Sequence, residues 1–536
     1  MGSEYFLMSN QIVKDAFRQI LWRVISALGG FITIKLITPF LGPLRYGDYN
    51  TVLKYFAIRS ALADLGLYTI ALRELGKMKS QLIENITGNK QKKLGIEQKE
   101  EVLHSIELDP ESTAKLSNYY SKFMGSRLIN LVIVYVLALW VAYLIPSYSS
   151  NPFIVWGLPL GMIFSATFVL GYFFQLPHQL FWSMQHTSIS LIIARVGQIA
   201  LLAIILYVFP HTEITASTPQ NILIFCLILA TVIASGLFQI ARQWWTGRRY
   251  LHLKLDLDRG FFKKHITDNW KYGIGYFMSS FHTLAVGLLL SWFYPTTAGY
   301  YFVWVWWLSM TLVEILLIVP SSLGNSALHK ISHKTDVEKR TSIGSLMSLI
   351  WIVWGLVALN FYRFSDIIIT FVSGTKYLSS TLWWIWSDII LWFLGIVLLL
   401  TFTKQVFNYM FIATDHQNKL FSVNTRWVIF WIGFASRAVY HFGLVGGIAG
   451  QLFVEALYVI GAIWIAYRNK VMPIINKKII WLTIAWVAGW CLLAYGLHYY
   501  QVFWTNQFIN LTIIWVYNIL LFGSIFKLTK KIMRGI

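Results

Sequence analysis

Long apolar runs alternate with short polar segments along almost the whole chain of 536 residues. An α-helix needs about 20 mostly apolar residues to cross the hydrocarbon core of a bilayer, and on that basis the pattern predicts about fourteen membrane-spanning helices. Their approximate ranges are 17–40, 47–72, 119–145, 152–176, 180–209, 220–244, 269–293, 297–321, 341–361, 381–407, 420–440, 444–467, 475–497 and 505–527. We therefore predict an all-α, polytopic membrane protein.

The composition agrees with this prediction. Hydrophobic residues make up 57% of the chain and charged residues only 12%, against roughly 25% charged residues in a typical soluble domain. Aromatic residues account for 17%, including 25 Trp, as expected of a protein that meets lipid headgroups. Cys226 and Cys491, the two cysteines, both lie inside apolar runs, so we expect neither a disulfide framework nor a cysteine-based metal site.

Basic residues gather in alternate connections between the predicted spans. The segments around 73–118, 245–268, 329–340 and 468–478 and the C-terminal tail are rich in Lys and Arg. The connections "IPSYSSNP", "FPHTEITASTPQ" and "YPTTAG" contain neither. This positive-inside pattern predicts that both chain termini are cytoplasmic. The formal net charge of +21 then reflects topology and contact with anionic lipid, and we do not expect nucleic-acid binding.

One polar segment, at about 78–118, is long enough to form a separate piece outside the membrane. Its "LDPESTAKL" stretch is typical of a helix start, with Asp109 as the N-cap and Pro110 at the first helical position. The segment is too small for a catalytic domain and the outer connections are short, so we do not expect an enzyme. A solvated surface insertion is the favoured interpretation, and a docking role is the alternative.

Two similar stretches each lie between two apolar runs, "LGPLRYGDYN" at 41–50 and "YPTTAGYYFV" at 294–303. Aligning them pairs the first two predicted spans with the seventh and eighth. A repeat with the same orientation in each half predicts two six-helix lobes around a central cavity that opens to either side. The N-terminal lobe is placed at 1–244, a basic cytoplasmic connection at 245–268, the C-terminal lobe at 269–470, and two additional helices at 471–536.

Several stretches carry a family resemblance. "LGPLRYGDYN" followed by "LADLGLYTIALREL" resembles the start of the polysaccharide and O-antigen flippase family, within the multidrug/oligosaccharidyl-lipid/polysaccharide exporter superfamily. The later stretches "FVSGTKYLSSTLWW", "ATDHQNKLFSVN" and "HFGLVGGIAGQ" are similar to that family in the expected order. The last two predicted helices go beyond the number usual for such flippases, and the 78–118 segment is longer than usual.

The resemblance implies a transporter of the inner membrane. It would move an undecaprenyl-pyrophosphate-linked polysaccharide unit from the cytoplasmic to the outer leaflet by alternating access. The expected partners are this lipid-linked oligosaccharide, membrane lipid and polysaccharide assembly proteins; no cofactor is expected, and H⁺ or Na⁺ is the candidate coupling ion. The alternatives within the superfamily are a lipid II flippase and a multidrug/cation antiporter. Outside it, they are a membrane glycosyltransferase or polymerase and a non-transporting scaffold.

Cations inside predicted spans are the candidate contacts for substrate phosphates, because each costs about 2.5–3.5 kcal/mol at a helix centre and usually faces a cavity or partner. The candidates are Arg23, Lys35, Lys54 and Arg59 in the first two spans and Arg195 in the fifth. Arg can donate two parallel hydrogen bonds to phosphate, and Arg23 and Arg59 best match the cations on the first helices of the resembling flippases. The alternatives are snorkelling for Lys35 and Lys54 and an ion pair with Asp64 for Arg59.

Groups that bind protons or hard cations also lie within predicted spans. They are Asp64, His282, Glu314, Asp388 and Glu455, which are candidates for coupling transport to an ion gradient. The alternative for each is a buried group that is neutral or satisfied by its neighbours. His329 and His333 have metal-compatible spacing, but two ligands in a basic turn are too few, so no metal site is predicted.

Aromatic clusters at 300–307 and 382–386 begin near the outer boundary of predicted spans. Aromatic belts are expected at that depth. Stacking against sugar rings is the alternative, for which Trp304 and Trp307 lie deep enough.

Overall fold

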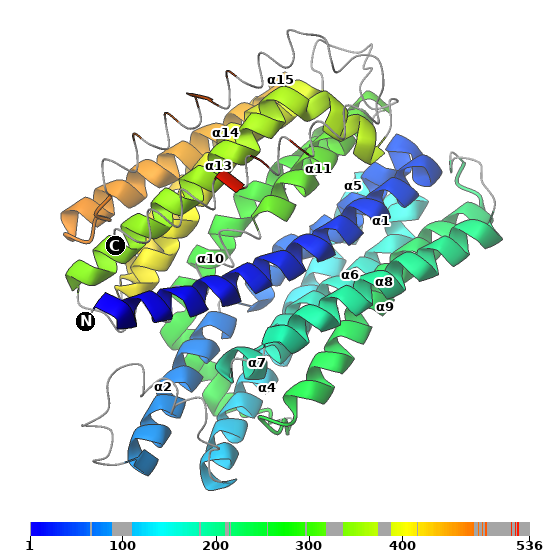
Figure 1. Ribbon diagram of the computed structural model, residues 1–536. Helices are drawn as coiled ribbons and strands as arrows, with labels where there is room; N and C mark the ends of the chain where they lie inside the picture. The colour runs from blue at the N-terminus through cyan, green and yellow to red at the C-terminus, as the bar shows by residue number, and fades with distance from the viewer. Residues whose placement is uncertain are drawn as a thin grey trace. The chain divides into compact units, whose positions relative to one another are not determined.

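The computed structural model describes most of the chain. The described residues are 2–64, 67–87, 110–181, 184–209, 214, 216–254, 256–294, 297–317, 336–373, 387–414 and 416–475, with a few positions between 481 and 524. For some helical residues, including 2–24, the backbone is described and the side chain is not. Every regular element in these ranges is a helix, which confirms the predicted fold class (Figure 1).

Six helical stretches among the described residues are long and apolar enough to cross a membrane, within α4, α6–α7, α8, α9, α14 and α15. The full set of helices is α1 (Gly2–Asp64), α2 (Leu67–Thr87), α4 (Pro110–Leu144), α5 (Pro146–Ser149), α6 (Pro152–Phe174), α7 (Leu176–Leu180), α8 (Met184–Val208), α9 (Pro219–Gly247), α10 (Arg259–Phe293), α11 (Thr297–Leu316), α13 (Asp336–Ser373), α14 (Ser387–Ala413) and α15 (Gln417–Arg468).

Two of these helices each join a pair of predicted spans at a glycine. α1 covers the first span and much of the second, and it kinks at Gly42, where φ is 63°. α15 covers the eleventh and twelfth spans and kinks at Gly443, where φ is 54°. Glycine adopts positive φ without a steric penalty because it has no Cβ. The "LGPLRYGDYN" stretch therefore contains the kink at Gly42, which separates two helical segments within α1.

The second predicted span covers the end of α1 and the start of α2. The prediction placed one helix over 47–72; α1 is described to Asp64 and α2 from Leu67, and residues 65 and 66 lie outside the described part of the chain. α2 is much less apolar than the spans and continues to Thr87. α2, the more polar of the two helices, leads into the 78–118 segment.

α4 is described from Pro110, and the predicted N-cap Asp109 lies outside the described residues, so the predicted helix start stays a prediction. α4 continues from there into the third predicted span without interruption. The end of the 78–118 segment is thus the first part of a membrane-spanning helix. Residues 88–109 of this segment lie outside the described part of the chain. The last two predicted helices, 475–497 and 505–527, also fall almost wholly outside it.

The chain forms two compact units. The N-terminal unit is Leu21–Trp304, and the C-terminal unit consists of Val305–Ile536 with Met1–Ile20. α10, the seventh predicted span, belongs to the N-terminal unit. The division into lobes at 1–244 and 269–470 stays a prediction.

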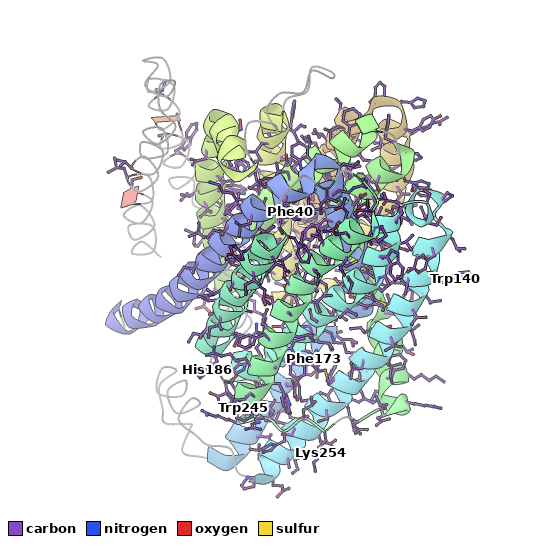
Figure 2. The ribbon with its side chains drawn as sticks, turned by 90° about the vertical axis from the view of Figure 1, so that its right-hand side faces the viewer. Phe40, Trp140, Phe173, His186, Trp245 and Lys254 are labelled. Carbon is purple, nitrogen blue, oxygen red and sulfur yellow. The ribbon has the colours of Figure 1, made fainter. Side chains whose placement is uncertain are left out.

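An apolar cluster holds α2, α4, α6 and α7 together at one end of the N-terminal unit. Its buried members are Leu67, Ile70, Ala71, Leu75, Leu116, Tyr120, Phe123, Met124, Phe173, Leu176, Leu180 and Leu251. Phe173 marks this region in Figure 2, with Trp245 and Lys254 nearby. Leu251 follows α9, so the chain that leaves α9 is anchored to the same cluster before α10 begins.

Hydrogen bonds from Trp and Tyr side chains join the helices of the C-terminal unit. Trp354 of α13 donates from Nε1 to the Gly395 carbonyl of α14 at 2.8 Å, and Trp351 donates to Thr403 Oγ1 at 3.0 Å. The Tyr458 hydroxyl of α15 donates to Asn408 Oδ1 of α14 at 2.7 Å. Each bond satisfies a polar group that would otherwise be costly to bury.

The aromatic cluster in α11 differs from the prediction. Trp304, Trp306 and Trp307 are each 0% exposed, so these three side chains neither form an interfacial belt nor face a sugar. Residues 303–310 are all buried, and large indoles contribute apolar surface to this packing. The second cluster, 382–386, lies outside the described residues.

Candidate functional site: cations within the membrane-spanning helices

The segment after the Gly42 kink is fixed by a buried polar network. Arg45 Nη1 donates to Asp48 Oδ2 at 2.9 Å, and Asn151 Nδ2 donates to Asp48 Oδ1 at 2.8 Å. Asn151 also caps α6, since its Oδ1 accepts a hydrogen bond from the Phe153 backbone N–H at 3.1 Å. The Arg45 guanidinium lies 3.9 Å from the centre of the Phe153 ring. The network joins the second half of α1 to the start of α6.

The hydrogen bond of Tyr55 shows at which level of α4 the neighbouring cation, Arg59, lies. Its hydroxyl donates to the Ala138 carbonyl of α4 at 2.8 Å. Ala138 lies about 9 Å along the axis from the end of α4 at Leu144. Arg59 follows Tyr55 by one helical turn, about 5.4 Å further in. Arg59 therefore lies about 14 Å from the level of Leu144, about half the thickness of a hydrocarbon core of about 30 Å.

Arg59 folds back along its own helix toward Tyr55. Its Nη1 donates to the Tyr55 carbonyl at 2.6 Å, and its Cζ lies 3.5 Å from the centre of the Tyr55 ring. The side chain is partly exposed. Among the described residues no carboxylate pairs with it, so its contacts are a carbonyl and a π face. A guanidinium carries five N–H donors, so Arg59 retains capacity for an anionic ligand.

A second tyrosine completes the surroundings of Tyr55. Tyr148, in the short helix α5, meets the Tyr55 ring edge to face at 5.7 Å between centroids. The Tyr148 hydroxyl lies 3.3 Å from Ser291 Oγ of α10. Helices α1, α5 and α10 of the N-terminal unit therefore converge beside Arg59.

Arg195 is a second intramembrane cation with neutral partners. It lies in α8, and its Nη1 donates to Gln198 Oε1 at 2.7 Å. Its side chain packs on α1, where a Cβ placed on Gly29 would lie 3.5 Å from Arg195 Cβ. The side chain is partly exposed. No carboxylate pairs with Arg195 in the part of the chain that the structure describes.

Asp64 pairs with a residue that the sequence analysis did not single out. Arg127 Nη2 lies 2.7 Å from Asp64 Oδ1, and the Arg127 side chain is 2% exposed. The alternative in which Asp64 pairs with Arg59 is therefore wrong. Asn130 holds the same region by donating to the Ala63 carbonyl at 2.6 Å. Since Arg127 falls inside the predicted span 119–145, the rule that selected Arg59 could also have identified it.

Glu455 is likewise engaged by a cation within the C-terminal unit. Lys404 Nζ donates to Glu455 Oε1 at 2.9 Å, and the two side chains are 4% and 0% exposed. Thr401 Oγ1 also donates to this oxygen, at 3.1 Å. Lys404 lies within the predicted span 381–407, so it too could have been found as an intramembrane cation.

The remaining predicted residues are placed only in part. Lys35 is exposed and Lys54 is half-buried. The side chains of Arg23, His282, Glu314 and Asp388 lie outside the described part of the structure, as do residues 329 and 333. Among the described residues no group of three or more His, Cys, Asp or Glu could hold a metal ion.

Five intramembrane cations with defined contacts fall into two classes among the described residues. Arg45, Arg127 and Lys404 are paired with carboxylates. Arg59 and Arg195 contact neutral groups only. A cation at this depth is expensive unless an anion or water compensates it. Arg59 and Arg195 are thus the described cations best suited to bind an anionic ligand.

Comparison with solved structures supports the fold. A MOP superfamily transporter from Pyrococcus furiosus, described as having a binding pocket of reverse polarity, matches with a TM-score of 0.55 at 12% identity, over 86% of this chain and 95% of that one. An outward-facing MATE multidrug resistance transporter of the MOP superfamily matches with a TM-score of 0.55 at 13% identity and the same coverage. The Vibrio cholerae MATE transporter VcmN matches with a TM-score of 0.54 at 14% identity, over 86% of this chain and 97% of that one.

At these identities the likeness concerns the fold alone, which is that of MOP superfamily transporters. No protein with a curated description matches the chain. The family of polysaccharide biosynthesis proteins matches residues 12–319, more than half of the chain. The protein is therefore a multi-pass membrane protein that belongs to the polysaccharide biosynthesis protein family.

Proposed function

We propose that this protein is a flippase that moves an undecaprenyl-pyrophosphate-linked oligosaccharide from the cytoplasmic to the outer leaflet of the inner membrane. The observation that carries the proposal is Arg59, a mid-membrane cation held by a carbonyl and a ring and by no described carboxylate. Family membership and the MOP transporter fold support it. Such a substrate carries a phosphate headgroup that must pass the membrane centre, where an arginine can compensate its charge.

The contacts of Arg59 suggest how binding would proceed. A guanidinium can offer two parallel N–H groups to a phosphate. The Tyr55 ring lies against one face of the Arg59 guanidinium, and the Tyr55 hydroxyl is fixed to Ala138. This leaves the guanidinium oriented before the substrate arrives. A phosphate would add a charge-assisted hydrogen bond, which contributes about 1.5–3 kcal/mol.

The other predicted cations extend the same role. Arg23, Lys35, Lys54 and Arg195 would contact the headgroup at other depths. Transport would follow from alternating access, in which the ligand shifts the balance between inward- and outward-open states. Both chain termini would lie in the cytoplasm, and the two six-helix lobes would enclose the cavity.

Ion coupling forms a further part of the proposal. Asp64, His282, Glu314, Asp388 and Glu455 are its candidates, with H⁺ or Na⁺ as the ion. Replacing Glu455 with Gln would then abolish the dependence of transport on the ion gradient. If transport by the Glu455→Gln variant still depended on the ion gradient at normal protein levels, Glu455 would be excluded as the coupling residue.

The charge distribution favours this substrate class over that of a multidrug/cation antiporter. A cationic drug needs a carboxylate that is available to it, yet Asp64 and Glu455 are each already paired with a cation. Arg59 and Arg195 present the opposite charge. A lipid II flippase shares the phosphate chemistry and stays the nearest alternative substrate assignment.

Translocation of a labelled lipid-linked oligosaccharide in proteoliposomes tests the proposal. Arg59→Gln should lower the rate about 10- to 100-fold, as expected from losing one charge-assisted bond. Arg59→Lys should retain part of the activity because the charge remains. Lys115→Gln is the matched control, since Lys115 forms an exposed ion pair with Glu111. An unchanged rate in a combined Arg23→Gln and Arg59→Gln variant would refute the headgroup-binding site.

A further inference from the structure

The last part of α9 presents an apolar face that leads to a pair of cations. The side chains of this face are each about half exposed: Leu237 (52%), Phe238 (47%), Trp244 (47%) and Trp245 (55%). Their spacing places them along one side of a helix. Arg248 and Arg249 follow immediately at the helix end and are exposed. We call this set of six residues the α9 stripe.

Arg248 is oriented by its neighbour in the α9 stripe. Its Cζ lies 3.7 Å from the centre of the Trp245 ring, within cation–π range. No described carboxylate pairs with either Arg248 or Arg249. Within the described part of the chain, the two guanidinium groups thus carry positive charge without a paired carboxylate, next to exposed indoles. Tryptophan is enriched at the level of lipid headgroups, so this arrangement fits a lipid interface.

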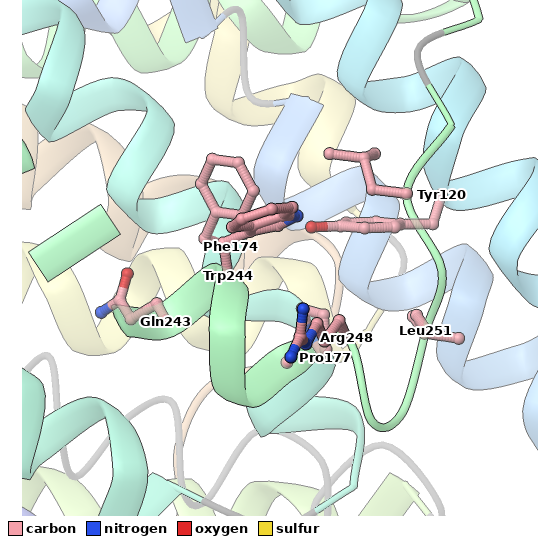
Figure 3. A pocket seen from close by; sticks show the side chains of 9 residues that line it. Tyr120, Phe174, Pro177, Gln243, Trp244, Arg248 and Leu251 are labelled. Atoms are coloured by element: carbon pink, nitrogen blue, oxygen red, sulfur yellow. The ribbon is translucent and has the colours of Figure 1, made fainter. Parts of the chain in front are cut away.

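A small pocket adjoins the α9 stripe. Tyr120, Phe174, Pro177, Trp244, Arg248 and Leu251 line much of it (Figure 3). Its volume is about 10 Å³, roughly that needed for one water molecule, and the pocket is partly open at the surface. Trp244 and Arg248 belong both to this pocket and to the stripe, so the site offers an apolar wall and a cationic rim side by side.

We propose that the α9 stripe binds one anionic glycerophospholipid. The phosphate would contact Arg248 and Arg249, the glycerol region would lie against Trp244 and Trp245, and an acyl chain would extend along Leu237 and Phe238. Charge selects the anionic lipid, because a zwitterionic headgroup carries its own compensating cation. This site is separate from Arg59 and does not depend on the protein being a flippase.

Lipid binding by the purified full-length protein in nanodiscs tests the proposal. Phosphatidylcholine discs with and without 20% phosphatidylglycerol would be compared by native mass spectrometry and thermal unfolding. The wild type should retain phosphatidylglycerol and show a higher Tm when it is present. Arg248→Gln with Arg249→Gln should weaken this binding about 30-fold, since each basic residue near an anionic surface contributes about 1 kcal/mol. Binding should also weaken at 0.5 M salt, because the charges are screened.

Two controls make the result specific to the α9 stripe. Lys263→Gln with Lys264→Gln removes the same charge from two exposed residues at the start of α10 and should leave phosphatidylglycerol binding unchanged. Tm in pure phosphatidylcholine reports the folding of each variant. Equal losses in both double variants would overturn the proposal, as would unchanged phosphatidylglycerol binding in the Arg248→Gln, Arg249→Gln variant.

Discussion

The carbonyl oxygen of Asp256 packs against Gly125 of α4 so closely that a Cβ on Gly125 would overlap it. Two serines on the same side of α4, one and two turns before Gly125, hold the chain that leads to this contact. The His252 backbone N–H donates to Ser117 Oγ, and the Lys254 backbone N–H donates to Ser121 Oγ, both at 3.0 Å. The chain between α9 and α10 thus lies along a groove of small residues, in step with the turns of α4.

The start of α10 is tied to α4 at the end of this groove. Asp258 caps α10 by accepting from the Phe261 backbone N–H at 3.0 Å, and it also accepts from Lys122 Nζ at 2.9 Å. These two hydrogen bonds lower the pKa of the Asp258 carboxyl. Phe261 then packs edge to face on Phe123 at 5.2 Å. Replacing Gly125 tests how much the contact between α4 and the chain that joins α9 to α10 contributes to stability.

We expect Gly125→Ala to destabilise the N-terminal unit by about 1–3 kcal/mol, the usual cost of overpacking. The clash is with a backbone oxygen, which cannot rotate away as a side chain could. Thermal unfolding in detergent measures the effect. Gly197→Ala is the matched control, because nothing lies within 4 Å of a Cβ at Gly197. Equal Tm values for the two variants would contradict the observed packing.

The Asp64–Arg127 pair should behave as a buried ion pair. Asp64→Asn leaves Arg127 charged and without its counter-ion, which costs about 3–5 kcal/mol. Adding Arg127→Met should recover much of this loss because the unpaired charge is removed. A double-mutant cycle on Tm or folded yield measures the coupling. Additive effects of the two single changes would show that the groups do not interact.

Two substitutions of Tyr55 should separate the role of its hydroxyl from that of its ring. Tyr55→Phe removes the hydrogen bond to Ala138 and should cost about 1 kcal/mol in stability, while the ring beneath Arg59 remains. Tyr55→Leu removes the ring as well and should reduce transport further, because the guanidinium loses its orienting surface. Rates per folded molecule in the translocation assay make the comparison. Identical rates for both variants would argue against a role for the ring.

Lys79 should make stability depend on pH. This residue of α2 donates from Nζ to the Leu180 carbonyl at 2.8 Å, and burial lowers its pKa from 10.5 to about 8. Between these values the unfolded chain binds a proton that the folded protein does not. Stability therefore rises with pH across that window.

The comparison with Lys79→Met isolates this contribution. The Tm of the wild type relative to the variant should increase as the pH is raised from 8 to 10. Below pH 8 the difference should level off, since Lys79 is then protonated in both states. Parallel pH curves for the two proteins would show that Lys79 has an ordinary pKa.

Much of the architecture could be predicted from the sequence, because crossing a bilayer imposes a local rule. About 20 apolar residues are required for each span, and α4, α6, α8 and α9 follow that rule closely. Glycine at the Gly42 and Gly443 kinks and Pro110 at a predicted helix start act through the backbone of a few neighbouring residues. Such features depend on short segments and can be recognised without knowing the tertiary contacts.

The partners of the intramembrane charges were decided by tertiary structure. Asp64 is only five positions from Arg59 in the sequence, yet it pairs with Arg127 on α4. The aromatic cluster at 300–307 begins near a predicted membrane boundary, yet its Trp304 and Trp307 are buried in protein. A residue's position along a helix determines its depth. The helix that packs against it determines whether its charge is compensated, and this choice depends on residues far away in the chain.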